Sequence, residues 1–314
     1  MILEEFTFLS QDGKTQIHGV KFIPDNRKWD KVVQITHGMQ EYILRYKDFA
    51  KYLTKKGCLV VGHDHLGHGD SVTSEEEMGF FCESFPSDVL VEDMDALRKM
   101  IQEENQKIPY FMLGHSMGSY MLRKYITLHG ENLAGVMLVG TGSMPDGVMK
   151  FGMAVCRTLA AVFGWHFRSR FVRKLSLLGP YRQFDSDGKI LEKNWLTKDL
   201  DIAEKYFKDE KCVFLFTVNG YYGLMEAVYY DNQPENIAKI PKDLPIFLAS
   251  GDMDPVGDLG TGVKKVYRQY KKAGITDLTW KLYKDDRHEI LNEVDRKTVY
   301  RNLYSWMEAH SSKS

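Results

Sequence analysis

A serine stands at the centre of the glycine-rich segment G-H-S-M-G, which reads Gly114, His115, Ser116, Met117, Gly118. A short apolar run precedes this segment and a helical pattern follows it. A turn from strand to helix of this kind leaves room only for small residues beside the nucleophile, and it exposes the serine hydroxyl. The alternative is an ordinary glycine-rich turn with a serine cap. We predict that Ser116 is the nucleophile of an acyl transfer reaction.

A serine nucleophile needs a base and an acid that orients the base. In the chain order typical of this arrangement, an Asp or Glu follows the serine and a His follows the acid. His288 comes shortly after the last apolar run, whereas His129 ends a helical pattern and His166 lies in a long insertion. Position therefore favours His288 as the general base.

Two carboxylates, Asp252 and Asp254, follow the apolar run at residues 246–249. The active sites of open α/β sheets lie at the carboxyl ends of the strands, where both aspartates are expected. Spacing alone leaves the two as near equals, with Asp252 also suited to forming a turn.

The residues His37 and Gly38 follow another apolar run, at residues 32–35. Glycine lets the backbone approach a substrate closely. We expect the backbone N–H groups of Met39 and Met117 to form an oxyanion hole. The alternative is a plain turn from a strand to a helix.

Three histidines and two aspartates lie within the eight residues from His63 to Asp70. Such a cluster could serve a metallohydrolase. However, distant ligands of matching character are hard to find, and Gly67 and Gly69 suit a tight loop after a strand. We therefore predict no metal site and no cofactor.

Short apolar runs predict the strands that position these residues. Buried parallel strands are expected at residues 32–35, 58–61, 110–113, 135–139, 246–249 and 278–283. Helical patterns at residues 46–56, 89–104 and 120–129 separate most of them, and alternating segments at 4–9 and 15–22 predict a hairpin. The pattern indicates an α/β fold with a mostly parallel, eight-stranded sheet flanked by helices.

The rhythm of strands and helices breaks between residues 143 and 239, a stretch too long for a loop. Residues 147–178 are apolar and basic, which predicts one or two amphipathic helices. We predict a core of residues 1–142 and 240–314, with residues 143–239 forming a helical cap.

The composition favours a small-molecule substrate. Lys plus Arg number 42 against 43 Asp plus Glu, so no overall charge attracts nucleic acid. The N-terminus lacks the pattern of a signal peptide and no apolar run could cross a bilayer, which predicts a cytoplasmic protein. The four cysteines are scattered without paired spacing, and we expect them to be reduced.

Together these motifs resemble the monoglyceride lipase and lysophospholipase branch of the α/β-hydrolases, which includes serine aminopeptidase-like members. The matching motifs are His37-Gly38-Met39, Arg45-Tyr46, Asp64 to Ser71, Gly114 to Gly118, Gly251 to Asp254, and His288. The resemblance favours Asp254 over Asp252 as the acid and makes Asp64 to Ser71 a structural turn. Many members carry glycine where this chain has Gln40.

The resemblance implies a serine carboxylester hydrolase that acts on acyl esters of single-chain lipids. Ser116, His288 and Asp254 would form its triad, with an acyl-enzyme as intermediate. An apolar face among basic residues leaves two possibilities for the cap, which are packing of that face on the sheet with the basic residues in solvent, or peripheral membrane contact. The alternatives are a peptidase of the aminopeptidase type, a metallohydrolase, and a non-catalytic receptor for an apolar ligand.

Overall fold

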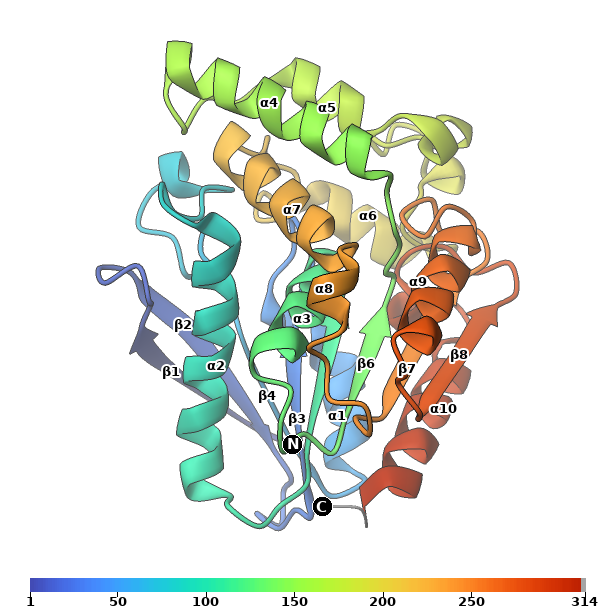
Figure 1. The fold of residues 1–314 in the computed structure, drawn as a ribbon. Helices are drawn as coiled ribbons and strands as arrows, with labels where there is room; N and C mark the ends of the chain where they lie inside the picture. Colours follow the sequence, from blue (N-terminus) through green and yellow to red (C-terminus); the bar gives the residue numbers. More distant parts are fainter. Residues whose placement is uncertain (312–314) are drawn as a thin grey trace.

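One eight-stranded sheet runs through the molecule, with helices on both of its faces (Figure 1). The computed structural model describes residues 1–311. The strand order is β1-β2-β4-β3-β5-β6-β7-β8. The strands are β1 (Ile2–Leu9), β2 (Gln16–Ile23), β3 (Lys31–Thr36), β4 (Cys58–His63), β5 (Tyr110–His115), β6 (Gly135–Val139), β7 (Ile246–Gly251) and β8 (Leu278–Tyr283).

Each of these strands lies where an apolar or alternating segment predicts one, so the predicted fold class is confirmed. Strands β3 to β8 pair in parallel, whereas β1 pairs with β2, and β2 with β4, in antiparallel register. Strands β3, β4, β5 and β7 are buried along their whole length. Burial on both faces explains why their sequences are continuous apolar runs instead of alternating ones.

Helices cover the two faces of the sheet with separate apolar cores. Helices α2 (Pro86–Glu104), α3 (Met117–Leu128) and α9 (Thr261–Lys272) pack on one face, and α1 (Lys47–Thr54) and α10 (Arg296–His310) pack on the other (Figure 1). Short 3₁₀ helices lie at Ile43–Tyr46, Glu75–Glu77, Gly179–Gln183, Leu191–Lys193 and Ile290–Asn292.

The chain between β6 and β7, residues 140–245, is called the insertion below. Its helices are α4 (Asp146–Phe163), α5 (Arg170–Ser176), α6 (Leu200–Lys208), α7 (Val218–Asp231) and α8 (Pro234–Ile237). Helices α4 and α5 extend across the end of the molecule toward which β3 to β7 point (Figure 1). The amphipathic stretch at residues 147–178 thus forms two helices, and the insertion overlies the carboxyl edge of the parallel strands.

Within residues 1–311, no helix is long and apolar enough to cross a bilayer. All four cysteines are free: Cys58, Cys156 and Cys212 are buried, and Cys82 is half-buried. Burial raises the pKa of the Cys58 and Cys156 thiols to about 12, which keeps them protonated and unreactive at neutral pH.

Candidate active site

Ser116 occupies a sharp turn between the last residue of β5 and the first residue of α3. Its backbone has φ 53° and ψ −122°, a conformation that L-residues rarely adopt. A Cβ on Gly114 would lie 2.4 Å from the carbonyl oxygen of Gly118, and one on Gly118 would lie 2.2 Å from that of Thr36. Only glycine therefore fits on either side of the serine. Helix α3 begins at Met117, earlier than the pattern near residue 120 predicts, so its positive N-terminus lies directly at the serine.

His288 and Asp254 are in contact, and they lie in the loops that follow β8 and β7. The distance from His288 Nδ1 to Asp254 Oδ1 is 2.9 Å, and the Asp254 side chain is fully buried. The carboxylate also accepts hydrogen bonds from the Ser250 hydroxyl (2.8 Å) and the Val256 N–H (2.9 Å). Burial raises the pKa of Asp254, but the adjacent His288 and these hydrogen bonds outweigh it and lower the pKa below its ordinary value. Asp254 is therefore ionised and holds the imidazole by Nδ1, with Nε2 on the opposite side of the ring.

The second carboxylate that the sequence offers has a different place. Asp252 Oδ1 accepts the backbone N–H of Asp285 at 2.7 Å, and the Asp252 side chain is half-buried. This bond closes the turn that follows β8. Asp252 thus joins two loops, whereas Asp254 contacts the imidazole.

A cavity of about 1320 Å³ lies between the sheet edge and the insertion, and both Ser116 and His288 line it. Most of its wall is apolar and comes from the insertion, including Met149, Val155 and Leu224. Among the described residues, no hydrogen bond joins the Ser116 hydroxyl to His288. Such contacts are often long in unliganded enzymes and shorten when substrate binds.

The loop after β3 lies against the serine. A Cβ on Gly38 would lie 2.9 Å from the Cβ of Ser116, so a larger residue would collide with the serine side chain. Met39 and Met117 both line the cavity, and no acceptor within residues 1–311 takes the backbone N–H of either. Two N–H groups are thus free to bind an oxygen of a ligand. Gln40 has φ 59°, so it keeps the left-handed conformation that glycine would adopt more easily.

His37 supports this loop from behind. Its Nδ1 lies 2.7 Å from the carbonyl oxygen of Gly38, and its Nε2 accepts the backbone N–H of His65 at 2.9 Å. The side chain is fully buried, and burial lowers its pKa. His37 therefore fastens the loop to the neighbouring turn as a neutral imidazole.

A buried ionic network lies behind the serine, and the sequence patterns do not predict it. Glu41 accepts hydrogen bonds from the Gly38 N–H (2.5 Å), His115 Nδ1 (2.8 Å) and the Tyr46 hydroxyl (2.9 Å). Burial raises the pKa of Glu41, but the charges of His115 and Arg45 outweigh it and hold the pKa far below its ordinary value.

Arg45 extends the network toward the predicted base. It donates to Glu41 and to both carboxylate oxygens of Glu289, each at 2.9 Å. A signal for this network exists in the sequence, because Glu289 directly follows His288 and Arg45 lies four residues after Glu41. The partners of a buried ion pair are far apart in the chain, however, so their pairing cannot be deduced from spacing.

The histidine-rich run from His63 to Asp70 forms a turn beside the site. Asp64 accepts the backbone N–H groups of Ile43 (2.7 Å) and Asp70 (2.9 Å) and contacts His18 Nδ1 at 2.8 Å. The rings of His63 and His68 are fully buried, and burial lowers the pKa of each to about 3. Within residues 1–311, the imidazoles of this run do not belong to any group of three side chains close enough to share an ion.

One group of possible ligands does include Asp64, together with His18 and Asp70. The Asp64 carboxylate in that group is already shared among the donors that shape the turn. Another such group, Glu92, Asp95 and His129, does not line the cavity of Ser116. The absence of a metal stays a prediction.

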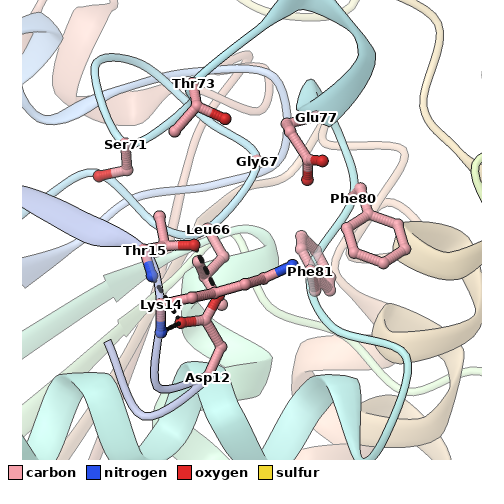
Figure 2. A pocket seen from close by; sticks show the side chains of 10 residues that line it. All are labelled: Asp12, Lys14, Thr15, Leu66, Gly67, Ser71, Thr73, Glu77, Phe80 and Phe81. Atoms are coloured by element: carbon pink, nitrogen blue, oxygen red, sulfur yellow. Dashed lines mark hydrogen bonds between the residues drawn. The ribbon is translucent and has the colours of Figure 1, made fainter. Parts of the chain in front are cut away.

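A smaller hollow of about 120 Å³ lies beside the β1–β2 hairpin (Figure 2). Asp12 at its edge accepts the Lys14 N–H, the Thr15 N–H and the Thr15 hydroxyl. Ser71 donates to the Asp64 carbonyl oxygen. The hydrogen bonds of Asp12 and Ser71 at this hollow stabilise the β1–β2 hairpin and the turn from Asp64 to Ser71. None of the predicted triad residues lines the hollow.

Comparison with known proteins agrees with this architecture. The sequence pattern of the family described as serine aminopeptidase, S33, matches residues 27–295. The chain is 25% identical to a monoacylglycerol lipase of Mycolicibacterium smegmatis over 285 residues, which cover 89% of this chain and 88% of the relative. It is 25% identical to the human monoglyceride lipase over 286 residues, which cover 90% of this chain and 83% of the relative.

A crystal structure of a thermostable carboxyl esterase from Bacillus coagulans superposes with a TM-score of 0.87. The two chains are 28% identical, and the match covers 98% of this chain and 99% of the esterase. These matches confirm the resemblance that the motifs suggest and the predicted enzyme class, a carboxylic ester hydrolase. The chain belongs to the serine aminopeptidase S33 family of the α/β-hydrolases.

Proposed function

We propose that this protein hydrolyses acyl esters of single-chain lipids by a Ser116, His288 and Asp254 triad. One observation carries the proposal: the strained serine and the buried His288–Asp254 pair open into one large, mainly apolar cavity. An apolar cavity of this volume suits an acyl chain better than a small polar substrate.

In the proposed reaction, the Ser116 hydroxyl attacks the ester carbonyl carbon while His288 Nε2 takes its proton. Asp254 holds the imidazole in the correct tautomer and stabilises its positive charge. The N–H groups of Met39 and Met117 bind the negative oxygen of the tetrahedral intermediate. His288 returns the proton to the leaving alcohol, which leaves an acyl-enzyme. Water attacks this ester as His288 accepts its proton, and the fatty acid departs as Ser116 recovers its hydrogen.

The residues around the triad support these roles. Gly114 and Gly118 make the serine turn possible, and Gly38 brings the oxyanion loop against it. His37 and His115 brace the loop through buried hydrogen bonds. We propose the same division of the chain as the sequence predicts, with residues 143–239 as a cap over a core of residues 1–142 and 240–314.

The family also includes peptidases, and the charges in the cavity argue against that activity here. An aminopeptidase needs a free carboxylate near the nucleophile to bind the substrate's amino group. Glu41 and Glu289 line the cavity, but both are bound to Arg45. Asp187 also lines the cavity, but it pairs with Arg173. The other acidic residue that lines the cavity is Asp258, which is exposed to solvent. The relatives named as monoacylglycerol lipases agree with an ester substrate.

We further propose that the insertion contacts lipid surfaces. Phe151, Val162, Phe163 and Phe171 on α4 and α5 are each more than half exposed. Exposed apolar groups on amphipathic helices favour binding at a membrane interface. A surface-bound enzyme would receive its substrate directly from the lipid layer.

The proposed function is tested with wild-type protein and Ser116→Ala. A fluorophosphonate probe should label the wild type and leave Ser116→Ala unlabelled, because the probe reacts with an activated serine. Kinetics with monoacylglycerols, p-nitrophenyl esters of increasing chain length and aminoacyl amides should favour medium or long acyl esters. Activity of Ser116→Ala within about tenfold of wild type, or a preference for aminoacyl amides, would overturn the proposal.

A further inference from the structure

Gln40 adopts an unfavourable backbone conformation next to the loop that carries Met39. Its φ of 59° lies in the left-handed region, where a side chain with a long aliphatic stem is disfavoured relative to glycine or asparagine. Backbone strain of this kind persists only where surrounding contacts hold it in place. The contacts of the Gln40 side chain are therefore candidates for a functional role.

The carboxamide of Gln40 reaches into the insertion. Its Nε2 donates a hydrogen bond to the carbonyl oxygen of Phe214, far away in the chain. The segment that follows is itself fixed, because Arg168 donates to the carbonyl oxygen of Leu215 and the Phe214 ring lies 5.9 Å from that of His68. The bond thus connects the loop after β3 to an anchored part of the insertion.

Met39 lies between two such attachments. On one side, the Gly38 N–H is bound to the buried carboxylate of Glu41. On the other side, Gln40 is bound to Phe214. Both Met39 and Gln40 line the cavity that contains Ser116. The direction of the Met39 peptide is thus set jointly by the core and by the insertion.

We infer that Gln40 is a positioning residue, which uses the insertion to hold the Met39 N–H toward the oxygen of the tetrahedral intermediate. This inference rests on the proposed function, in which the Met39 N–H is an oxyanion donor. It predicts that the length of the side chain at position 40 affects turnover but does not affect substrate binding. Movement of the insertion at Phe214 would then change the rate at Ser116.

Two variants distinguish the effect of side-chain length at position 40 from the effect of backbone strain there. Gln40→Gly removes the side chain and relieves the left-handed strain, whereas Gln40→Asn tolerates that conformation but is one methylene too short for Phe214. Asn132→Gly is the matched control, because Asn132 also has φ 59° but is exposed and does not line the cavity. For each protein, kcat and KM for p-nitrophenyl butyrate, the rate of fluorophosphonate inactivation and the Tm are measured.

We expect both Gln40 variants to lose at least about tenfold in kcat with KM within about twofold of wild type, since an oxyanion donor acts mainly in the transition state. Inactivation by fluorophosphonate should slow in parallel. The Tm of Gln40→Gly should stay close to that of wild type, because relief of strain offsets the lost hydrogen bond. Asn132→Gly should keep wild-type kinetics.

Unchanged kcat in both variants would overturn the inference, as would a loss of kcat that merely follows a large drop in Tm. The proposed function fails separately, if wild-type protein does not react with the probe or if Ser116→Ala stays active. If the wild type reacts with the probe and the Gln40 variants react equally fast, the proposed triad stands and only the role of Gln40 is refuted.

Discussion

The carboxylate of Asp254 is fully buried and receives three hydrogen bonds. Such an arrangement keeps the group ionised, as the lowered pKa of Asp254 indicates. An ionised, immobile carboxylate is what a histidine base needs in order to hold one tautomer. Asp252, bound to the N–H of Asp285 in a surface turn, lacks both the burial and the imidazole contact.

The two aspartates therefore make a matched pair for mutagenesis. Asp254→Asn should lower kcat/KM for a p-nitrophenyl ester by about 10⁴, because the amide would favour the wrong tautomer of His288. Asp252→Asn keeps most of its turn and should cost less than about tenfold, the scale of an indirect effect. Steady-state kinetics measures both, with Tm to verify folding. A larger loss in Asp252→Asn would move the orienting role to that residue.

At the scale of elements, the close approach of α3 to β3 is a requirement of the serine turn. A Cβ on Gly118 would lie 2.2 Å from the carbonyl oxygen of Thr36, which is backbone and cannot step aside. A Cβ on Gly147, in the first turn of α4, would meet no other atom within 4 Å. Both glycines lie in the first turn of a helix, but only Gly118 packs against backbone.

We expect Gly118→Ala to push α3 away from β3, lowering Tm and abolishing most ester hydrolysis. Gly147→Ala should raise stability by about 0.5 kcal/mol, because alanine is the better helix former and meets no obstacle. Thermal unfolding and kcat/KM distinguish the two. Normal activity and Tm in Gly118→Ala would contradict the geometry of the turn.

Elements of the sheet can be predicted from the sequence because each buried strand is an uninterrupted apolar run. The helical pattern places the start of α3 too late, since Gly118 and Ser119 resemble a loop while tight packing requires them in the helix. Helix α7 escapes prediction for a different reason. It is buried around most of its circumference and includes Asn219, so it lacks an amphipathic period.

The residues of the site differ in how well the sequence predicts them, because some are marked by local motifs and others depend on contacts between distant segments. Ser116 and His288 are marked by local motifs and chain order, whereas the choice between Asp252 and Asp254 needs a resemblance to known proteins. The Arg45–Glu289 pair spans 244 positions, and the bond from Gln40 to Phe214 spans 174. Contacts between distant segments leave no local sequence pattern, so they can be identified only in the folded structure.

On the scale of the whole molecule, α4 and α5 lie across the end toward which the parallel strands point (Figure 1), and they expose Phe151, Val162, Phe163 and Phe171. The basic residues of the insertion are less free than the sequence suggests. Arg157 donates to the Tyr222 hydroxyl, Arg168 donates to backbone carbonyls, and Arg173 pairs with Asp187. Apolar contact should therefore outweigh charge in binding to lipid.

This balance gives a prediction for vesicle binding. Within residues 1–311, Lys150, Arg170 and Lys174 on α4 and α5 are exposed cations for which the structure records no ion pair. Each cation near an anionic surface contributes about 1 kcal/mol, and salt screens this contribution. Burial of Val162 and Phe171 in the lipid interface should contribute about 1.5 to 3 kcal/mol for each fully buried side chain. We expect the protein to co-sediment with neutral vesicles. Its binding to anionic vesicles should be moderately stronger at low salt. High salt should remove only this additional binding to anionic vesicles.

The double variant Val162→Ser, Phe171→Ser should lose binding to both kinds of vesicle, because it removes the apolar contribution that the two share. Val294→Ser is the control, since Val294 is 61% exposed but lies outside the insertion. The double variant should keep wild-type kcat/KM on a water-soluble short ester, because neither side chain lines the cavity. Its activity on monoacylglycerol presented in vesicles should fall together with binding. If the double variant sediments as wild type does, or if salt removes all binding, the apolar face of α4 and α5 is not the membrane contact.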